Sequence, residues 1–241
     1  MMFRWIIRED GGVLRNAFSR HEIVAAAVEY KDFPIYTASQ NLLSSISQGA
    51  IIIFLTRYFD ISVVGYFAFA SRILLVPWSL VYSSLSRVLF QKLSEANNKG
   101  QDLLLLFKKS SRGLFLFFFS SGVIGMLLSP TIFALVFGEK WRTAGVYAQW
   151  LFVWMIPALV NLPASLGLRV LRRQRALFIY EVVLCLVRFS SLAIATQCSN
   201  SPIVTIAAFW IASGLLEIWL LWYGWRTIRH HRGVSSQPSI A

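Results

Sequence analysis

Four charged side chains lie inside long apolar stretches of this sequence, and their type and position point to function. Arg72, Glu181, Arg188 and Glu217 each have mostly hydrophobic neighbours on both sides along the chain. A charge in the hydrocarbon of a membrane costs several kcal/mol unless it is paired or hydrated, so it faces a bundle interior or a cavity. Charged residues in such positions commonly mark the path of a substrate or an ion.

Arg72 lies near the middle of its apolar stretch. It is about ten residues from the start, which corresponds to a depth of about 15 Å in an α-helix. Ser79, Ser83 and Ser86 follow on the same face at helical spacing, and Pro77 permits a bend because it frees a backbone carbonyl. A structural ion pair with a carboxylate on another helix is the alternative. We favour a cavity position for Arg72 and Ser79.

Polar residues gather on one face of the first apolar stretch. At 100° per residue they fall within an arc of about 160°, in the half of the stretch nearer the N-terminus. They are Thr37, Gln40, Asn41, Ser44, Ser45, Ser47 and Gln48. One or two such residues would serve as hydrogen bonds between packed helices. So many on one face favour a water-accessible cavity wall, and its candidate residues are Gln40, Asn41, Ser44 and Gln48.

The last two apolar stretches carry the other charges. Glu181 and Arg188 share a face but lie about 10 Å apart along the axis, which is too far for a direct ion pair. Glu217 reaches a depth between them on the neighbouring helix. Two interpretations are therefore equally well supported. Arg188 and Glu217 form a structural ion pair, or Arg188 lines a cavity while Glu181 and Glu217 couple transport to an ion. Glu181 lies closer to the interface, where its side chain can extend toward water.

Membrane-spanning helices must position these residues. Of the 241 residues, 56% are hydrophobic and 14% are charged, against about 25% charged in soluble domains. A span needs about 20 mainly apolar residues, and continuous apolar runs favour helices over the alternating strands of a membrane barrel. Six stretches meet this requirement: Tyr36–Phe59, Ser62–Val88, Gly113–Phe137, Ala144–Leu168, Ala176–Gln197 and Pro202–Trp225. We predict an all-α integral membrane protein of six transmembrane helices.

The positive charges predict the orientation of these helices. Of the 23 Lys and Arg residues, 18 fall in the two terminal segments and the second and fourth connections. The positive-inside rule places these parts, and so both termini, in the cytoplasm. We predict a cytoplasmic N-terminal segment over residues 1–35, a transmembrane domain over 36–225 and a basic, polar cytoplasmic tail over 226–241. The net charge of +12 then results from the basic cytoplasmic segments, which attract anionic membrane lipids. We expect no nucleic acid as a partner.

The sequence contains no motif of an enzyme class. It has no phosphate-binding Gly-rich loop, no HExxH and no nucleophile elbow. Cys185 and Cys198 make neither a disulfide framework nor a metal site. The tryptophans suit interface belts or packing, and we assign them no ligand. We therefore expect no catalysis, no cofactor and no metal.

Several short motifs occur between about residues 30 and 145. They are Tyr30-Lys31-Asp32-Phe33-Pro34, then Val64-Gly65-Tyr66, Ala70-Ser71-Arg72-Ile73-Leu74 with Pro77, Ser86 with Phe90, and Phe137-Gly138-Glu139-Lys140-Trp141 followed by Ala144-Gly145. In order and spacing they resemble bacterial polysaccharide flippases of the O-antigen and teichoic-acid exporter type, in the MOP flippase superfamily. A second acidic residue is common in that family where Lys140 stands. The remainder of the chain is similar mainly in hydropathy.

The resemblance implies a fold and a task. Such proteins have two six-helix lobes around a central cavity in the bacterial cytoplasmic (inner) membrane. They flip a polyprenyl-pyrophosphate-linked oligosaccharide, such as an O-antigen, capsule or exopolysaccharide repeat unit, by alternating access, and ion gradients are implicated in coupling. Basic cavity residues hold the pyrophosphate or acidic sugars. Arg72 matches the arginine of the family's eighth helix, and arginine suits bidentate phosphate binding.

The chain is similar to the second lobe of such a transporter only. We expect it to need another six-helix lobe, as a separate chain or a second copy, and to flip no lipid-linked sugar alone. It is then a fragment of a split gene or half of a transporter. One alternative is a lobe of a multidrug or other-lipid exporter of the same superfamily. A six-span permease domain of an ATP-driven exporter would have helices that extend well beyond the bilayer, and a sugar-lipid ligase or polymerase would have a large outward loop.

Overall fold

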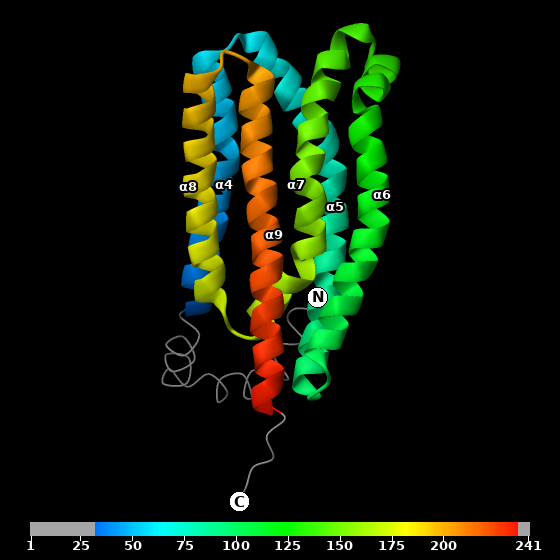
Figure 1. Ribbon diagram of the computed structural model, residues 1–241, viewed down its shortest axis with the longest axis vertical. Coiled ribbons are helices and arrows are strands. Elements are labelled where there is room, and N and C mark those ends of the chain that lie inside the picture. Colours follow the sequence, from blue (N-terminus) through cyan, green and yellow to red (C-terminus); the bar gives the residue numbers. More distant parts are fainter. Residues whose placement is uncertain (1–31, 236–241) are drawn as a thin grey trace, which may run out of the picture.

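The computed structural model describes residues 32–235, which form a bundle of long helices (Figure 1). The helices are α4 (Asp32–Tyr58), α5 (Ile61–Asn98), α6 (Leu103–Phe137), α7 (Arg142–Val170), α8 (Gln174–Cys198) and α9 (Pro202–Ser235), with a 3-10 turn η1 (Glu139–Trp141) before α7. This part of the chain contains no strand, and its six helices are long and apolar enough to cross a membrane. The predicted all-α fold with six transmembrane helices is confirmed.

The two ends of α6 show how local chemistry sets helix boundaries. Asp102 precedes the helix in extended backbone, and its carboxylate accepts hydrogen bonds from the backbone N–H groups of Leu104 and Leu105 at 3.0 and 3.2 Å. These N–H groups have no partner inside the helix, so the side chain caps it. At the other end Gly138 has a φ of 95°, a conformation that strains any residue with a Cβ. This glycine lets the chain leave α6 and enter η1.

Several helices run beyond the predicted spans. The connection expected over residues 89–112 is helical except at residues 99–102, so α5 and α6 extend about 15 Å past the predicted spans. Hydropathy missed this hairpin because its turns are rich in charged residues that form helix well. Long helices of this kind are the feature expected of the permease domain of an ATP-driven exporter, so helix length does not exclude that alternative.

The chain ends differ from the predicted parts in a similar way. α4 begins at Asp32, inside the segment predicted over 1–35, and α9 continues to Ser235, through much of the tail predicted over 226–241. Residues 1–31 and 236–241 lie outside the described part of the chain. The six helices themselves match the predicted spans in order and number.

α7 is the central helix of the bundle. It packs against α6, α9 and α5, whereas α4 packs mainly against α8 and makes few contacts with α5. Figure 1 shows α4 and α8 together on one side, α5 and α6 on the other, and α7 and α9 between them. Small residues allow α7 and α9 to approach closely: a Cβ on Gly224 would lie 2.6 Å from the Cβ of Ala164.

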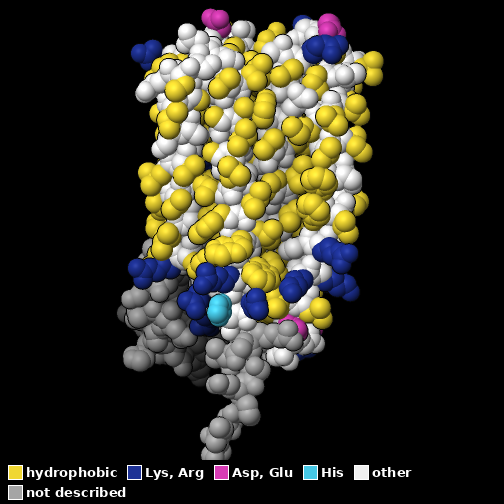
Figure 2. All heavy atoms as spheres, viewed as in Figure 1, with side chains coloured by type: hydrophobic (Ala, Val, Ile, Leu, Met, Phe, Trp, Pro, Cys, Tyr) yellow, Lys and Arg dark blue, Asp and Glu magenta, His cyan; other side chains and the backbone are white. Residues whose placement is uncertain are grey.

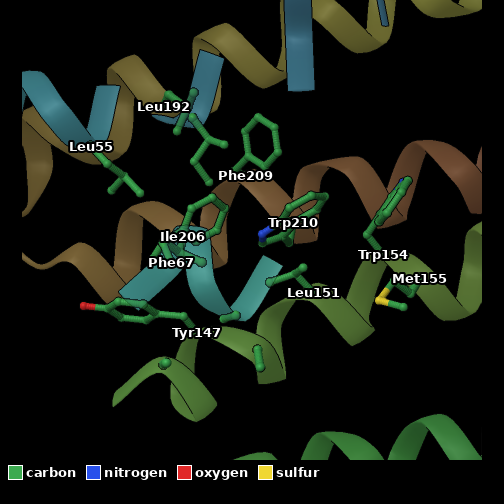
Figure 3. Close-up of a cluster of buried hydrophobic side chains, with 14 of the residues drawn as sticks. Leu55, Phe67, Tyr147, Leu151, Trp154, Met155, Leu192, Ile206, Phe209 and Trp210 are labelled. Carbon is green, nitrogen blue, oxygen red and sulfur yellow. The ribbon is translucent and has the colours of Figure 1, made fainter. Parts of the chain in front are cut away.

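The largest cluster of buried side chains lies toward the end of the bundle where α4 connects to α5. Figure 3 shows this cluster, in which α7 and α9 contribute most of the labelled rings and aliphatic groups. Its labelled members are Leu55, Phe67, Tyr147, Leu151, Trp154, Met155, Leu192, Ile206, Phe209 and Trp210. This end of the bundle is therefore densely packed, whereas the opposite half contains smaller buried hydrophobic clusters.

The two ends of the bundle differ in charge. Figure 2 shows an apolar band around the middle and a concentration of Lys and Arg at the end where α9 finishes. Residues at this end include Arg87, Lys92, Lys99, Lys108, Lys109, Arg112, Arg169, Arg172, Arg173, Arg175, Arg226 and Arg229, whereas the opposite end has Arg57, Lys140 and Arg142. The distribution is the one from which the orientation was predicted.

Candidate functional site

A polar cavity of about 300 Å³ lies inside the bundle, between the large core cluster and the basic end. Side chains from α4, α5, α7, α8 and α9 line it. They include Gln40, Asn41, Ser44, Gln48, Trp78, Tyr82, Trp154, Asn161, Ser165, Arg169, Tyr180, Glu181, Arg188 and Glu217. Asn41 and Gln48 are exposed, so the cavity reaches the bundle surface along α4.

The carboxylate of Glu217 is held in the cavity wall by two donors from α7. The Asn161 side chain donates from Nδ2 to Oε2 at 2.7 Å, and the Trp154 indole donates from Nε1 to Oε1 at 3.2 Å. Each carboxylate oxygen thus has its own donor, and the two bonds fix α9 against α7. Asn161 is 2% exposed, and its Oδ1 has no hydrogen-bond partner in the described residues. The Asn161 side chain therefore contributes one hydrogen bond to the cavity wall and keeps one buried acceptor without a partner in the described residues.

Arg188 is the most deeply buried charge, with 1% of its surface exposed. Its guanidinium donates to Ser213 Oγ of α9 at 2.9 Å and to Ser47 Oγ of α4 at 2.8 Å. It also lies 5.2 Å from the centre of the Phe209 ring, within the range of a cation–π contact. Arg188 therefore joins three helices and presents a positive charge to the cavity. Ser47 contributes to the site by holding Arg188, and is not itself in the lining.

The buried charges do not pair directly with one another. The Lys99–Glu95 and Arg142–Glu139 ion pairs lie at exposed positions near helix ends, and neither includes one of the buried charges. The possible Arg188–Glu217 pair is therefore not formed, because serine hydroxyls and α7 donors take up the two groups. Glu181 is 6% exposed and lines the cavity, so the expectation that it reaches the interface is wrong. Its Oε1 has no hydrogen-bond partner in the described part of the chain.

The polar face of α4 forms one wall of this cavity. Its four candidate residues, Gln40, Asn41, Ser44 and Gln48, are all in the lining. Gln48 donates to Ser44 Oγ at 3.0 Å, so these two side chains form a continuous polar surface. Ser45 instead donates to the backbone carbonyl of Asn41 at 2.9 Å and lies outside the cavity. The structure thus brings the α4 candidates together with Glu181, Arg188 and Glu217.

Arg72 and Ser79 do not line this cavity within the bundle, so their predicted cavity position stays a prediction for a surface that another lobe would cover. Both are exposed on the outer face of α5, and Arg72 makes no hydrogen bond or ion pair with the described residues. Ser79 donates only to the backbone carbonyl of Val76. At 100° per residue Arg72 lies about 80° around the helix axis from Tyr82, which is in the lining. Arg72 therefore lies outside the bundle, beside the cavity.

Sequence reasoning missed the contribution of α7. Asn161 has hydrophobic neighbours and lies two residues before Pro163, and a buried amide in such a stretch needs partners. That signal was present but not used. Trp154 was assigned to an interface belt or packing, but its indole N–H serves the cavity carboxylate. The packing of α7 against α9 decides both roles, and one sequence does not reveal which helices are neighbours.

The lining combines groups that suit a ligand with several hydroxyls and a phosphate. Amide and hydroxyl side chains can donate and accept hydrogen bonds, as sugar hydroxyls do. Arg169 and Arg188 can bind an anionic group, and the rings of Trp78 and Trp154 offer apolar faces. Glu181 and Glu217 balance these two positive charges.

Comparison with known proteins matches part of the chain to a family. A family model described as a polysaccharide biosynthesis protein matches residues 15–145, which is more than half of the 241 residues. The matched range contains α4, α5, α6 and the beginning of α7. No match was found among curated proteins or among solved structures.

Proposed function

The chain belongs to this family of polysaccharide biosynthesis proteins, and from that premise we propose that it is one lobe of a polysaccharide-precursor transporter. The expected resemblance to the flippases is confirmed by the family match. The proposed cargo is a polyprenyl-pyrophosphate-linked oligosaccharide, such as an O-antigen, capsule or exopolysaccharide repeat unit. The protein moves this cargo across the membrane by alternating access, as a carrier and not as an enzyme.

The polar cavity is the observation that carries this proposal. It lies between helices whose outer surfaces are apolar, at a depth where a polar ligand has no other hydrogen-bond partners. Gln40, Asn41 and Gln48 suit sugar hydroxyls, and Arg188 suits a phosphate group. Glu181 and Glu217 in the same wall are candidates for binding the coupling ion.

A second lobe completes the site in this proposal. A volume of about 300 Å³ is at the lower limit for ligand pockets and is too small for an oligosaccharide repeat unit. Arg72 lies exposed near the middle of the apolar part of α5, where contact with lipid would cost several kcal/mol. Asn41 and Gln48 of α4, which line the cavity, are also exposed at the surface of the bundle. A partner lobe, either another chain or a second copy, would cover these residues and enlarge the cavity between the two lobes.

The proposed location is the bacterial cytoplasmic membrane, with both termini in the cytoplasm. The concentration of Lys and Arg at the end of the bundle where α4 begins and α9 finishes supports this orientation (Figure 2). In this orientation the packed core cluster is on the outer side, and the polar cavity is on the cytoplasmic side of that cluster. A substrate assembled in the cytoplasm would therefore meet the polar half first.

Binding of a lipid-linked saccharide by purified chain tests this proposal. Native mass spectrometry would compare a polyprenyl-pyrophosphate disaccharide with the same lipid lacking sugar. Asn41→Leu removes a cavity amide, whereas Ser45→Leu changes an exposed residue of the same helix outside the cavity. Loss of about one hydrogen bond should weaken disaccharide binding roughly tenfold in Asn41→Leu and leave Ser45→Leu unchanged. Equal affinities for the three proteins would contradict the proposed binding site.

A further inference from the structure

A second pocket lies beside the polar cavity and shares Trp78 with it. It has a volume of about 270 Å³ and lies between α5, α6 and α7. Apart from Ser121 and Gly122, its lining consists of hydrophobic side chains and Pro77. We propose that this pocket binds isoprenoid units of a polyprenyl chain, and so holds the lipid end of the substrate beside the cavity that binds its polar end. The inference rests on the proposed transport function.

The position of the pocket defines the chemical class of its ligand. Its α5 wall, from Leu74 to Val81, lies about 20 to 30 Å from the start of that helix, and so in the hydrocarbon part of a membrane. Val81 is 40% exposed and Phe117 on the neighbouring surface of α6 is 69% exposed, so the surroundings of the pocket are apolar and uncovered. The Ser121 hydroxyl donates to the Phe117 carbonyl at 2.9 Å. The pocket therefore suits a hydrocarbon chain.

Trp78 places this pocket next to the polar site. Its ring centre lies 4.9 Å from that of Tyr82 and 5.0 Å from that of Trp154, and both of these rings line the polar cavity. Trp78 also lines the apolar pocket, together with Leu74 and Val81 of the same helix. An indole has an apolar body and one polar N–H, so the same side chain can border a polar and an apolar ligand. A ligand with both characters fits this arrangement.

Depth distinguishes an isoprenoid carrier from an ordinary phospholipid. A phospholipid keeps its headgroup at the interface, about 15 Å from the membrane centre, and leaves the polar cavity empty. A lipid-linked sugar whose diphosphate enters the cavity has its first isoprenoid units at the depth of Trp78. The polar cavity and the apolar pocket lie side by side at the depth of Trp78. Together they therefore favour the isoprenoid carrier, whose diphosphate and first isoprenoid units would lie at that same depth.

Photolabelling in nanodiscs tests the inference with the full chain. The probes are a diazirine-bearing polyprenol, which has neither phosphate nor sugar, and a phosphatidylcholine with the diazirine in an acyl chain. Labelled peptides are mapped by mass spectrometry. We expect the polyprenol to label residues 118–122 and 152–159 several-fold more than the phospholipid does, relative to labelling elsewhere on the bundle. The same ratio for both probes would overturn the inference.

A matched pair of variants locates the binding. Ser121→Phe fills the pocket from its exposed edge, whereas Ser120→Phe adds the same ring at an adjacent exposed position outside it. Gly122 is unsuitable because a Cβ would lie 2.5 Å from Ile156 and disturb packing. We expect Ser121→Phe to abolish the preferential polyprenol labelling and Ser120→Phe to retain it; equal labelling of both variants would overturn the assignment. Since the probe carries neither phosphate nor sugar, its labelling does not depend on saccharide binding in the polar cavity, and failure of that binding would be seen separately.

Discussion

Replacing Asn161 by alanine removes the shorter of the two hydrogen bonds that hold Glu217 in the cavity wall. The Asn161 bond is 2.7 Å long and the Trp154 bond is 3.2 Å long. Interhelical hydrogen bonds in membrane proteins contribute about 0.6 kcal/mol on average and up to about 1.7 kcal/mol. Short bonds to a carboxylate belong at the upper end of that range. We therefore expect a coupling energy of about 1.5 kcal/mol between Asn161 and Glu217, and about 0.6 kcal/mol between Trp154 and Glu217.

Two double-mutant cycles measure these couplings. One combines Asn161→Ala with Glu217→Leu, and the other combines Trp154→Phe with Glu217→Leu. Phenylalanine keeps most of the ring packing at position 154 while it removes the N–H donor. Reversible unfolding by SDS in mixed micelles, followed by circular dichroism, gives the free energy of unfolding of each variant. The cycle then separates the pairwise energy from the separate cost of each substitution.

The two coupling energies also define what would refute the reasoning. A value below about 0.3 kcal/mol for the Asn161 cycle would show that the bond does not hold Glu217 in place. A larger value for the Trp154 cycle would contradict the order that the two distances predict. The cavity geometry assigned to α7 and α9 would then need revision.

Three further predictions concern packing, capping and the exposed arginine. Gly145→Ala should lower the free energy of unfolding by about 1–3 kcal/mol, because an added Cβ would lie 2.5 Å from the α6 backbone. Gly113→Ala has open space, and equal SDS midpoints for these two glycine variants would contradict the close contact. Asp102→Ala should cost about 1 kcal/mol of unfolding free energy because it removes a helix cap. Asp60→Ala removes no side-chain cap bond, so an equal loss measured in both aspartate variants would count against the cap. Arg72→Leu should favour membrane insertion of its helix by about 3 kcal/mol in a translocon insertion assay, while it reduces transport by the two-lobe assembly. Unchanged insertion would contradict an uncovered arginine at that depth.

Much of the fold could be predicted because hydropathy reports directly on the membrane. Each span needs enough apolar residues to cross the hydrocarbon, so the number and order of the helices follow from the sequence. The extensions of α5 and α6 were missed because charged residues interrupt the hydropathy there, although α6 itself begins with the apolar residues Leu103–Phe107. Capping at Asp102 marks this start, ten residues before the predicted span.

The site was predictable where several residues on one helix share a chemical character. The polar face of α4 indicated a cavity wall, and Gln40, Asn41, Ser44 and Gln48 line it. Depth alone did not show that Arg72 lies apart from this cavity, because depth does not tell which side of a helix faces the bundle. Its helix turns Trp78 and Tyr82 toward the cavity and Arg72 outward.

Contacts between helices distant in sequence could not be predicted from the residues alone. Arg188 is bonded to Ser47, 141 positions earlier in the chain, and to Ser213, 25 positions later. Depth suggested Glu217 as its partner, but Asn161 lies closer to that carboxylate. The choice among partners depends on which helices pack together and how each is rotated, and hydropathy constrains neither.

Transport in proteoliposomes tests most directly whether this chain is one lobe of a carrier. Fluorescently tagged polyprenyl-pyrophosphate oligosaccharide would be incorporated into both leaflets. Its movement would be followed after addition of an external quencher, as a decrease in the fluorescence of the tags in the inner leaflet, which the quencher cannot reach. The account predicts no movement above protein-free vesicles for this chain alone, and movement after a complementary six-helix lobe is reconstituted with it. Robust movement by the chain alone, as a single copy per vesicle, would contradict the need for a second lobe.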